Sequence, residues 1–412
     1  MNLTIDTNRL HGEIEQLARI SDTAYPSVTR VLFSEVDVKA RAWLKTLYAA
    51  AGLSVREDAV GNTFARWEGS EPSAAPVATG SHTDAIPNAG RFDGVVGVLG
   101  GLEAIRTLQR AGFRPRRSVE LVMFTAEEPT RFGFGCLGSR VLAGTMQPWQ
   151  LEKLRDRDGL TLDEARARAG CRGTIAEARL PQGCYHAFVE LHIEQGPLLE
   201  QWSVPIGVVT AIAAPASIRF EFTGEGGHAG TVLMPDRHDP SLAAAEAMLA
   251  VERAALATGS RDTVATCGLV QVQPGAINSI PRHVKLEIDV RDIDGPRRDG
   301  VLEAIRQAAK AAAAGRGCGF AEQLINSDPP ATCAPAIVEA VEGSCAAAGL
   351  DCRRMISRAY HDSLFMAQVC PTAMIFLPCR GGYSHRPDEY ASPEAIARGV
   401  EVLARTLARL AT

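Results

Sequence analysis

The stretch that decides the fold runs from residue 77 to residue 101 and reads VATGSHTDAIPNAGRFDGVVGVLGG. Its first five residues are small or β-branched, which predicts a short buried strand at Val77–Ser81. A polar loop follows, and over Val95–Arg110 apolar residues recur at helical spacing. A strand, a loop and a helix in this order are typical of an α/β fold, in which the chemistry lies at the carboxyl ends of the strands.

Imidazole and carboxylate groups follow this strand and three others. The loop after Val77–Ser81 contains His82, Asp84 and Asp93. The other strands and the polar residues at their ends are Ser118–Thr125 with Glu127 and Glu128, Phe188–His192 with His192, and Ala373–Leu377 with His385. Because the carboxyl ends of parallel strands lie at one edge of a sheet, we expect these groups to converge there.

The remaining patterns predict two domains. Helices are expected at residues 7–20, Val38–Ala51, Ala336–Ala348 and Ser392–Arg409. Between them lie alternating, half-buried strands at Val208–Thr223 and Val264–Asp292, and Ala-rich helices at Pro240–Ala257 and Gly300–Ala314. We therefore predict an α/β catalytic domain made from residues 1–207 and 327–412, interrupted by a smaller α+β domain at 208–326.

The composition excludes several classes of protein. The 412 residues are 46% hydrophobic and 22% charged, which is typical of a soluble globular protein. A net charge of -5 leaves no basic surplus for a nucleic-acid partner, and no apolar run approaches the roughly 18 residues that span a membrane. The ten cysteines form no CxxC pair and the first residues lack a signal-peptide pattern, which predicts free thiols and a cytoplasmic protein.

The residue types at the strand ends suit a pair of divalent metal ions. Imidazole nitrogen and carboxylate oxygen bind such ions, and one carboxylate has to bridge two ions that lie roughly 3.5–4 Å apart. The Glu127–Glu128 pair offers both a ligand and a free base that takes a proton from water. The competing interpretation of this pair is a solvated acidic start of a helix, and each histidine taken singly is also explained as a structural residue.

Six segments resemble the M20 metallopeptidase family, and within it the hydantoinase/carbamoylase amidohydrolases. That group includes N-carbamoyl-L-amino acid hydrolases, allantoate amidohydrolases and ureidoglycolate amidohydrolases. The segments are GSHTDAIPNAGRFDGVVGVLGGLEA, FTAEEPTRFGFGCLGS, ELHIEQGPLLE, GHAGTVLMPDRHD, GAINSIP with DVRD, and IFLPCRGGYSHRPDEYA. The resemblance implies a zinc-exopeptidase-like catalytic domain with an inserted α+β, ferredoxin-like lid and dimerisation domain.

The resemblance also implies the metal ligands and the base. One ion corresponds to His82, Asp93 and His192, and the other to Asp93, Glu128 and His385, with Asp93 as the bridge. Glu127 matches the general base, and Asp84 matches the carboxylate that orients the imidazole of His82. The implied cofactors are two divalent ions per subunit, zinc or manganese, with cobalt or nickel as alternatives.

Further matches concern the substrate. Gln195 matches a contact to its ureido or amide end, and His228 matches the residue that stabilises the tetrahedral intermediate. Asn278 and Arg291 match residues that grip the substrate, Arg291 through its carboxylate, although Arg291 is also explained by a surface run of ion pairs. In the family the lid domain forms the dimer, so the resemblance implies a homodimer in which these residues can reach the neighbouring subunit's site.

One position departs from most of the family. Tyr360 precedes His361 in SRAYHDSLFMA, where carbamoylases and allantoate amidohydrolases mostly carry Gly, and this resembles the ureidoglycolate amidohydrolases. A ring near the scissile group would shrink the pocket and favour a small substrate. We therefore count Tyr360 and His361 among the substrate-binding residues, with a packed core Tyr as the alternative.

The predicted function is hydrolysis of a linear C–N bond in an N-carbamoyl or ureido acid, a small-molecule substrate, by metal-activated water. One open alternative is an M20 aminoacylase or dipeptidase. Another is a catalytically silent relative that binds metal or a carboxylate ligand. The intact Glu127 argues against the silent relative, because a pure binding site needs no base.

Overall fold

The structure, a computed structural model, describes residues 1–412 and divides into two compact units. The large unit consists of Met1–Thr210 and Thr332–Thr412, and the inserted unit consists of Ala211–Ala331. None of the helices combines the length and the apolar character that a membrane crossing requires.

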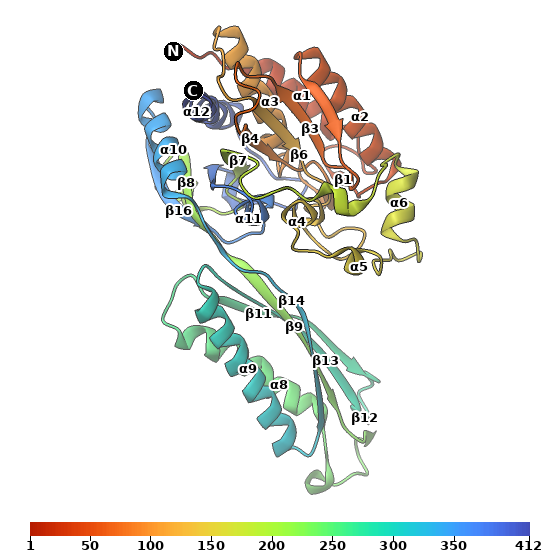
Figure 1. Cartoon of the computed structure of the whole chain (residues 1–412). Helices are drawn as coiled ribbons and strands as arrows, with labels where there is room; N and C mark the ends of the chain where they lie inside the picture. Colours follow the sequence, from red (N-terminus) through yellow and green to blue (C-terminus); the bar gives the residue numbers. More distant parts are fainter. The chain divides into compact units, whose positions relative to one another are not determined.

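A nine-stranded sheet forms the centre of the large unit (Figure 1). Its order is β15-β8-β17-β7-β4-β6-β3-β2, and β16 pairs with β8. The strands are β2 Ser54–Glu57, β3 Thr63–Trp67, β4 Val77–Ser81, β6 Val119–Met123, β7 Ala187–Ile193, β8 Ile206–Ile212, β15 Ala331–Thr332, β16 Cys352–Ser357 and β17 Thr372–Leu377. The central strands β17, β7, β4 and β6 are parallel and buried along their whole length, which confirms the predicted α/β class.

Helices cover both faces of this sheet. The helices of the large unit are α1 Thr7–Ala18, α2 Glu35–Ala50, α3 Val95–Arg110, α4 Leu137–Ala143, α5 Pro148–Leu151, α6 Leu162–Arg168, α7 Leu198–Trp202, α10 Pro335–Ala348, α11 Asp362–Met366 and α12 Pro393–Leu410. Successive side chains of β7 point to opposite faces: Leu191 packs toward α3 and α12, whereas Glu190 accepts hydrogen bonds from Ser363 in α11. Outside the main sheet, β1 Val28–Arg30 pairs with β5 Ala85–Ala89.

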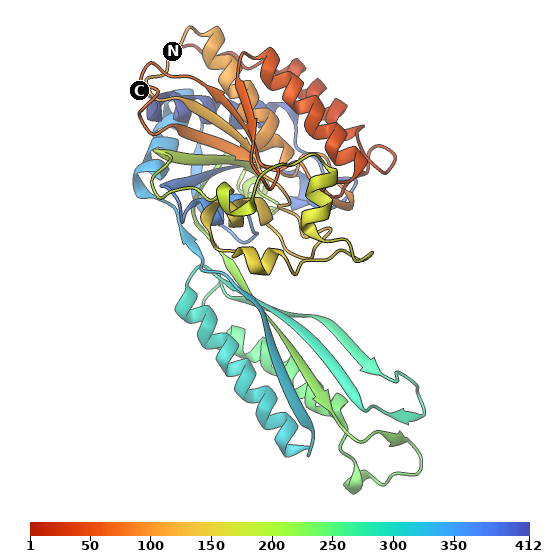
Figure 2. The ribbon, with the colours of Figure 1, turned by 45° about the vertical axis from the view of Figure 1, so that its right-hand side comes forward.

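The inserted unit follows the order βαββαβ, which is that of the ferredoxin-like motif. Its principal elements are β9 Ala214–Thr223, α8 Pro240–Ala257, β11 Val264–Gln273, β13 His283–Asp292, α9 Gly295–Gly315 and β14 Gly319–Ser327, with the short strands β10 Gly227–His228 and β12 Ser279–Ile280. The sheet order is β11-β13-β9-β14, all antiparallel. Both long helices lie on one face of this sheet (Figures 1 and 2), where residues such as Phe220 and Ile305 form the core.

Some predicted elements were wrong in detail. The stretch expected to be strand at Val208–Thr223 is two strands, β8 and β9, which belong to different sheets. The break at Ala213 was missed because residues 211–216 (AIAAPA) are all apolar, so no polar residue marks the end of β8. Helix α9 begins at Gly295 rather than Gly300, because the Asp294 side chain accepts a hydrogen bond from the Arg297 N–H (2.9 Å) and caps the helix.

Candidate metal centre

Four of the predicted ligands come from the carboxyl ends of the four central strands, and Asp93 precedes α3. His82 directly follows β4, and His192 is the penultimate residue of β7. Glu127 and Glu128 lie in the loop after β6, and His385 lies in the loop after β17. Because β17, β7, β4 and β6 are neighbours in this order, these side chains lie at one edge of the sheet.

The first group of ligands is His82, Asp93 and His192. The Oδ1 atom of Asp93 lies 3.6 Å from His82 Nε2 and 3.1 Å from His192 Nε2. Both imidazoles are buried, and the Asp93 side chain is 9% exposed. Two nitrogens and one carboxylate oxygen thus converge on a single point, as one metal ion requires.

The second group is Asp93, Glu128 and His385. The Nε2 atom of His385 lies 3.1 Å from Glu128 Oε1 and 3.5 Å from Asp93 Oδ2. Asp93 therefore turns one carboxylate oxygen toward each group. This is the arrangement of a carboxylate that bridges two ions.

The hydrogen bonds of the buried histidines fit metal binding. His82 Nδ1 lies 3.1 Å from the carbonyl oxygen of Asp84, and His192 Nδ1 lies 2.9 Å from that of Ile193. An Nδ1–H that donates to a carbonyl leaves Nε2 unprotonated, as metal binding requires, and both Nε2 atoms face Asp93; that of His192 also accepts a hydrogen bond from the Gly94 N–H (3.1 Å). The residues at this edge therefore fit a divalent metal centre.

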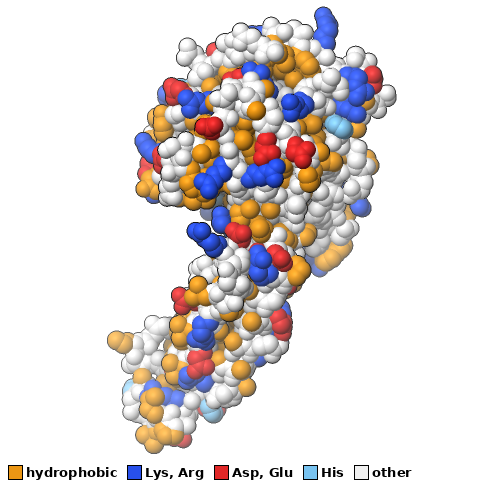
Figure 3. All heavy atoms as spheres, turned by 90° about the vertical axis from the view of Figure 1, so that its left-hand side faces the viewer, with side chains coloured by type: hydrophobic (Ala, Val, Ile, Leu, Met, Phe, Trp, Pro, Cys, Tyr) orange, Lys and Arg blue, Asp and Glu red, His pale blue; other side chains and the backbone are white.

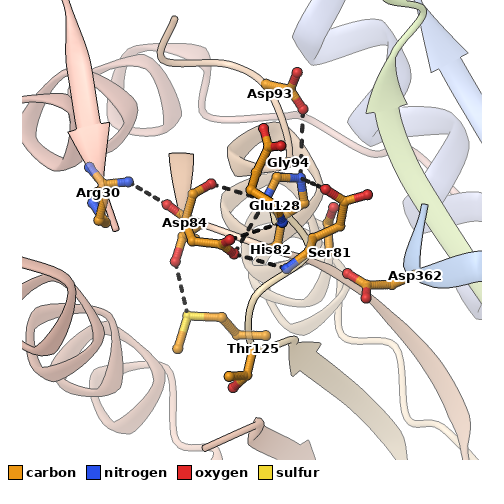
Figure 4. A network of polar contacts seen from close by, with 12 residues as sticks. Arg30, Ser81, His82, Asp84, Asp93, Gly94, Thr125, Glu128 and Asp362 are labelled. Atoms are coloured by element: carbon orange, nitrogen blue, oxygen red, sulfur yellow. Dashed lines mark hydrogen bonds and ion pairs between the residues drawn. The ribbon is translucent and has the colours of Figure 1, made fainter. Parts of the chain in front are cut away.

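Asp84 joins the two sides of the centre (Figure 4). Its carboxylate accepts hydrogen bonds from the backbone N–H groups of Glu127 (3.3 Å) and Glu128 (3.0 Å). It lies 3.6 Å from His82 Nδ1, so the closer contact to this ring is the Asp84 carbonyl oxygen rather than the carboxylate. Asp84 thus positions the Glu127–Glu128 pair as well as the imidazole.

Glu127, the predicted base, belongs to neither group of ligands. Its Oε2 atom lies 3.8 Å from His82 Nε2, and its Oε1 atom lies 3.5 Å from the thiol of Cys136. Burial raises the pKa of Glu127 well above its usual value, and the charge of His82 opposes this shift. A carboxylate beside the ligands but outside both groups is what a general base requires.

Three residues around Asp93 complete the site. Gln195 Nε2 donates to Asp93 Oδ2 (2.7 Å), while its Oε1 atom is buried without a hydrogen-bond partner. The Ser384 hydroxyl lies within hydrogen-bonding distance of both the same Asp93 oxygen and Glu389 Oε2 (3.0 Å to Glu389). Glu389 accepts from the Asp93 N–H (3.1 Å), and burial raises the pKa of Glu389 to about 7. Ser384 and Glu389 were missed, although both lie in the segment that contains His385.

Tyr360 and His361 lie on the α11 side of the sheet. The ring of His361 is buried against that of His192 (centroids 4.6 Å apart), and its Nε2 lies 2.9 Å from Ser357 Oγ. Tyr360 is half-buried, stacks on Phe365, and accepts a hydrogen bond from Arg140 Nη2 (3.1 Å). Both residues are therefore held by neighbours that the sequence analysis did not identify.

The other predicted substrate contacts lie in the inserted unit. His228 and Asn278 are neighbours, because β10 pairs with β12 and the carbonyl of Asn278 accepts from the Ala229 N–H (2.9 Å). Arg291 lies near the opposite end of β13 and donates to Asp289 (2.8 Å). The ten residues of β13 span roughly 30 Å at roughly 3.3 Å per residue, so the unit does not bring Arg291 to His228 and Asn278.

Comparisons with known proteins identify the relatives of this chain. The model of Peptidase family M20/M25/M40 matches residues 78–409. A ureidoglycolate hydrolase of Oryza sativa subsp. japonica is 55% identical over 98% of this chain and 85% of its own. An N-carbamoyl-L-amino acid amidohydrolase of Geobacillus stearothermophilus is 38% identical over 99% of both chains.

Solved structures show the same fold. The crystal structure of AtUAH in complex with glyoxylate has a TM-score of 0.90 and 51% identity, covering 99% of this chain and 98% of that one. A hydantoinase/carbamoylase family amidase from Burkholderia multivorans has a TM-score of 0.89 and 37% identity over the same shares of the two chains. The family match and the paired ligand groups indicate an enzyme that uses divalent metal. The chain thus belongs to peptidase family M20/M25/M40 and, within it, to the hydantoinase/carbamoylase amidohydrolases.

Proposed function

We propose that this chain is a binuclear-metal amidohydrolase that cleaves the linear C–N bond of a ureido acid, with ureidoglycolate as its substrate. One observation carries the proposal: two groups of ligands share Asp93, and the carboxylate of Glu127 lies beside them without belonging to either. We assign one divalent ion to each group, zinc or manganese, with cobalt or nickel as alternatives.

The chain's own residues supply the acid–base chemistry. When bound, the two ions would lower the pKa of a water molecule and polarise the substrate carbonyl. Glu127 accepts a proton from this water, and the oxygen attacks the carbamoyl carbon. The bond from that carbon to the substrate nitrogen breaks as Glu127 returns the proton to the nitrogen. The carbamic acid that leaves decomposes to carbon dioxide and ammonia, and His228 stabilises the oxyanion before the bond breaks.

The choice of ureidoglycolate rests on the relatives and on Tyr360. Identity to the ureidoglycolate hydrolase is 55%, against 38% for the N-carbamoyl-L-amino acid amidohydrolase. The solved neighbour AtUAH holds glyoxylate, a two-carbon acid. Tyr360 is held between Arg140 and Phe365, and a fixed ring limits the size of the acid that the site accepts. An N-carbamoyl-L-amino acid is the second candidate, supported by the 38% relative.

Tyr360→Gly should reduce the preference for ureidoglycolate over N-carbamoyl-L-alanine at least about tenfold in kcat/KM, because the pocket gains the space of a ring. The measurement is ammonia release from ureidoglycolate, allantoate and N-carbamoyl amino acids, with acetate release from N-acetyl amino acids testing for an aminoacylase. Tyr25→Gly, at an exposed tyrosine, serves as the control and should keep the wild-type ranking. Wild-type protein that releases ammonia from none of the ureido acids would contradict the function, whereas an unchanged ranking in Tyr360→Gly would contradict only the role of the ring.

We propose further that the chain works as a homodimer through the inserted unit, which also serves as a lid. Arg291 lies near the end of β13 that is remote from His228 and Asn278, so a substrate that meets all three needs residues from two chains. Helix α8 also exposes Leu242 (43%), Leu249 (55%) and Leu256 (73%) at seven-residue spacing. Figure 3 shows hydrophobic side chains at the surface of this unit among charged ones. Such a stripe suits packing against the same helix of a second copy around a two-fold axis.

Leu249→Asp should raise the dimer dissociation constant at least about 100-fold, because it places two carboxylates in an apolar contact. Sedimentation velocity at micromolar concentration should find two chains for the wild type and one for the variant. Activity should fall with dimer content while bound metal stays unchanged. Val55→Asp, at a similarly exposed position on β2, should remain dimeric, and a dimeric Leu249→Asp would refute this interface.

The free cysteines support a proposal about the cellular compartment of the protein. All ten are unpaired thiols in the structure. Unpaired thiols are typical of reducing compartments, which supports our assignment of the chain to the cytoplasm.

A further inference from the structure

A fully buried arginine lies beneath the metal centre. Arg30, the last residue of β1, is 1% exposed, and it forms no ion pair. Its guanidinium donates only to backbone carbonyls: that of Thr83 through Nη1 (2.6 Å), and those of Leu17 and Ile20 through Nη2 (2.7 and 2.9 Å) and Nε (3.1 Å, to Ile20). Burying a charge in this way is costly, so its position calls for an explanation.

Thr83 stands between the ligand His82 and the residue Asp84. Arg30 therefore fixes the peptide that orients both side chains and ties it to the carboxyl end of α1. Figure 4 shows Arg30 beside Asp84. The backbone acts at the same place, because Arg30 pairs with Ala85, the residue after Asp84, in the β1–β5 ladder. A shift of the Thr83 carbonyl would thus move the His82 ring and the Asp84 carboxylate that holds the Glu127 and Glu128 amides.

We infer that Arg30 is a positioning residue of the metal centre, which sets the orientation of His82 and Asp84 through the carbonyl of Thr83. This inference rests on the metal centre of the proposed function. A fork of several N–H groups is needed, because a single ammonium cannot reach the carbonyls of Thr83, Leu17 and Ile20 together.

The charge of Arg30 works in the same direction. Burial lowers its pKa to about 10, and the carboxylates of Asp37 and Asp84 oppose this shift. The guanidinium therefore stays charged at neutral pH. A positive charge behind the loop attracts the carboxylate of Asp84 and so helps to hold it in place.

The test compares metal affinity with stability in three variants. Arg30→Met removes the charge and the fork, and Arg30→Lys keeps the charge alone. Arg298→Met is the matched control: Arg298 is also buried (3%) and donates to the carbonyls of Ala214 (3.3 Å) and Pro215 (3.5 Å), but it belongs to the inserted unit. Metal-free protein is titrated with Mn²⁺ or Zn²⁺ against a chromophoric chelator, and its thermal unfolding is recorded without metal.

Arg30→Met should raise the metal dissociation constant at least about tenfold, which is the usual cost of losing a residue that orients a ligand. The metal dissociation constant of Arg30→Lys should lie between those of Arg30→Met and the wild type. The lysine variant also keeps the inference testable if Arg30→Met does not fold. Arg298→Met should lower the unfolding temperature without changing the metal dissociation constant. The inference would be overturned if both Arg30 variants bound metal with wild-type affinity, or if Arg298→Met weakened metal binding as much as they do. A wild-type chain that binds no metal would instead refute the proposed function.

Discussion

Glu127→Gln is expected to lower kcat by about a thousandfold while the variant binds metal as the wild type does. The amide has nearly the shape of the carboxylate, but it cannot accept the proton of the attacking water, and general bases typically contribute about 10²–10⁴-fold. Glu127 is in neither group of ligands, so the metal content should stay unchanged. Because burial raises the pKa of Glu127, a neutral side chain there should not destabilise the metal-free protein.

The measurement is steady-state ammonia release, together with metal analysis of the same preparation. Glu120→Gln is the matched control. Glu120 is also buried and lies on β6, but near the start of the strand, where its carboxylate accepts a hydrogen bond from the Tyr185 hydroxyl. That variant should keep its turnover within a few-fold. A Glu127→Gln enzyme with near-wild-type kcat would show that another group takes the proton.

Asp93→Asn is expected to abolish turnover by removing both ions rather than one. The Asp93 carboxylate turns Oδ1 to one ligand group and Oδ2 to the other, and an asparagine keeps only one oxygen that can bind a cation. We expect metal content to fall from about two ions per chain to less than one, and activity to fall at least about a thousandfold. His385→Ala removes one ligand, from the second group alone, and should therefore weaken the binding of one ion.

Metal content per chain, measured after removal of free ions by gel filtration, tests this expectation. Asp388→Asn changes an exposed carboxylate in the same segment as His385, paired only with Arg386, and should bind both ions. An Asp93→Asn protein that retains two ions would show that Asp93 is no bridge, and the two groups would then have to be treated as separate sites.

Much of the large unit could be predicted from local sequence. The strand Val77–Ser81 and the helix Val95–Arg110 have the bounds that periodicity and composition predict. The apolar residues within each segment are enough to show which side chains are buried. The break between β8 and β9 could not be predicted in this way. Alternation describes one face of a strand and carries no information on which sheet the strand joins.

The candidate site shows the same division. Strand ends and a family resemblance identify the residues that meet at the sheet edge, since both depend on short segments. Contacts between distant segments could not be inferred, such as Ser384 on Asp93, Arg140 on Tyr360 and Arg30 on Thr83. Each joins residues more than fifty positions apart, and each depends on the packing of several elements rather than on any one pattern.

The strand order β8-β17-β7 has a consequence for biosynthesis. A ribosome that has translated β7 and β8 has not yet made the strand that separates them, because β17 begins only at Thr372. The place of β17 in the sheet therefore stays empty while the whole inserted unit is synthesised. His385 is synthesised after β17. The second group of ligands is therefore complete only near the end of synthesis, and the half-built sheet before that point is the state in which a chaperone would be needed most.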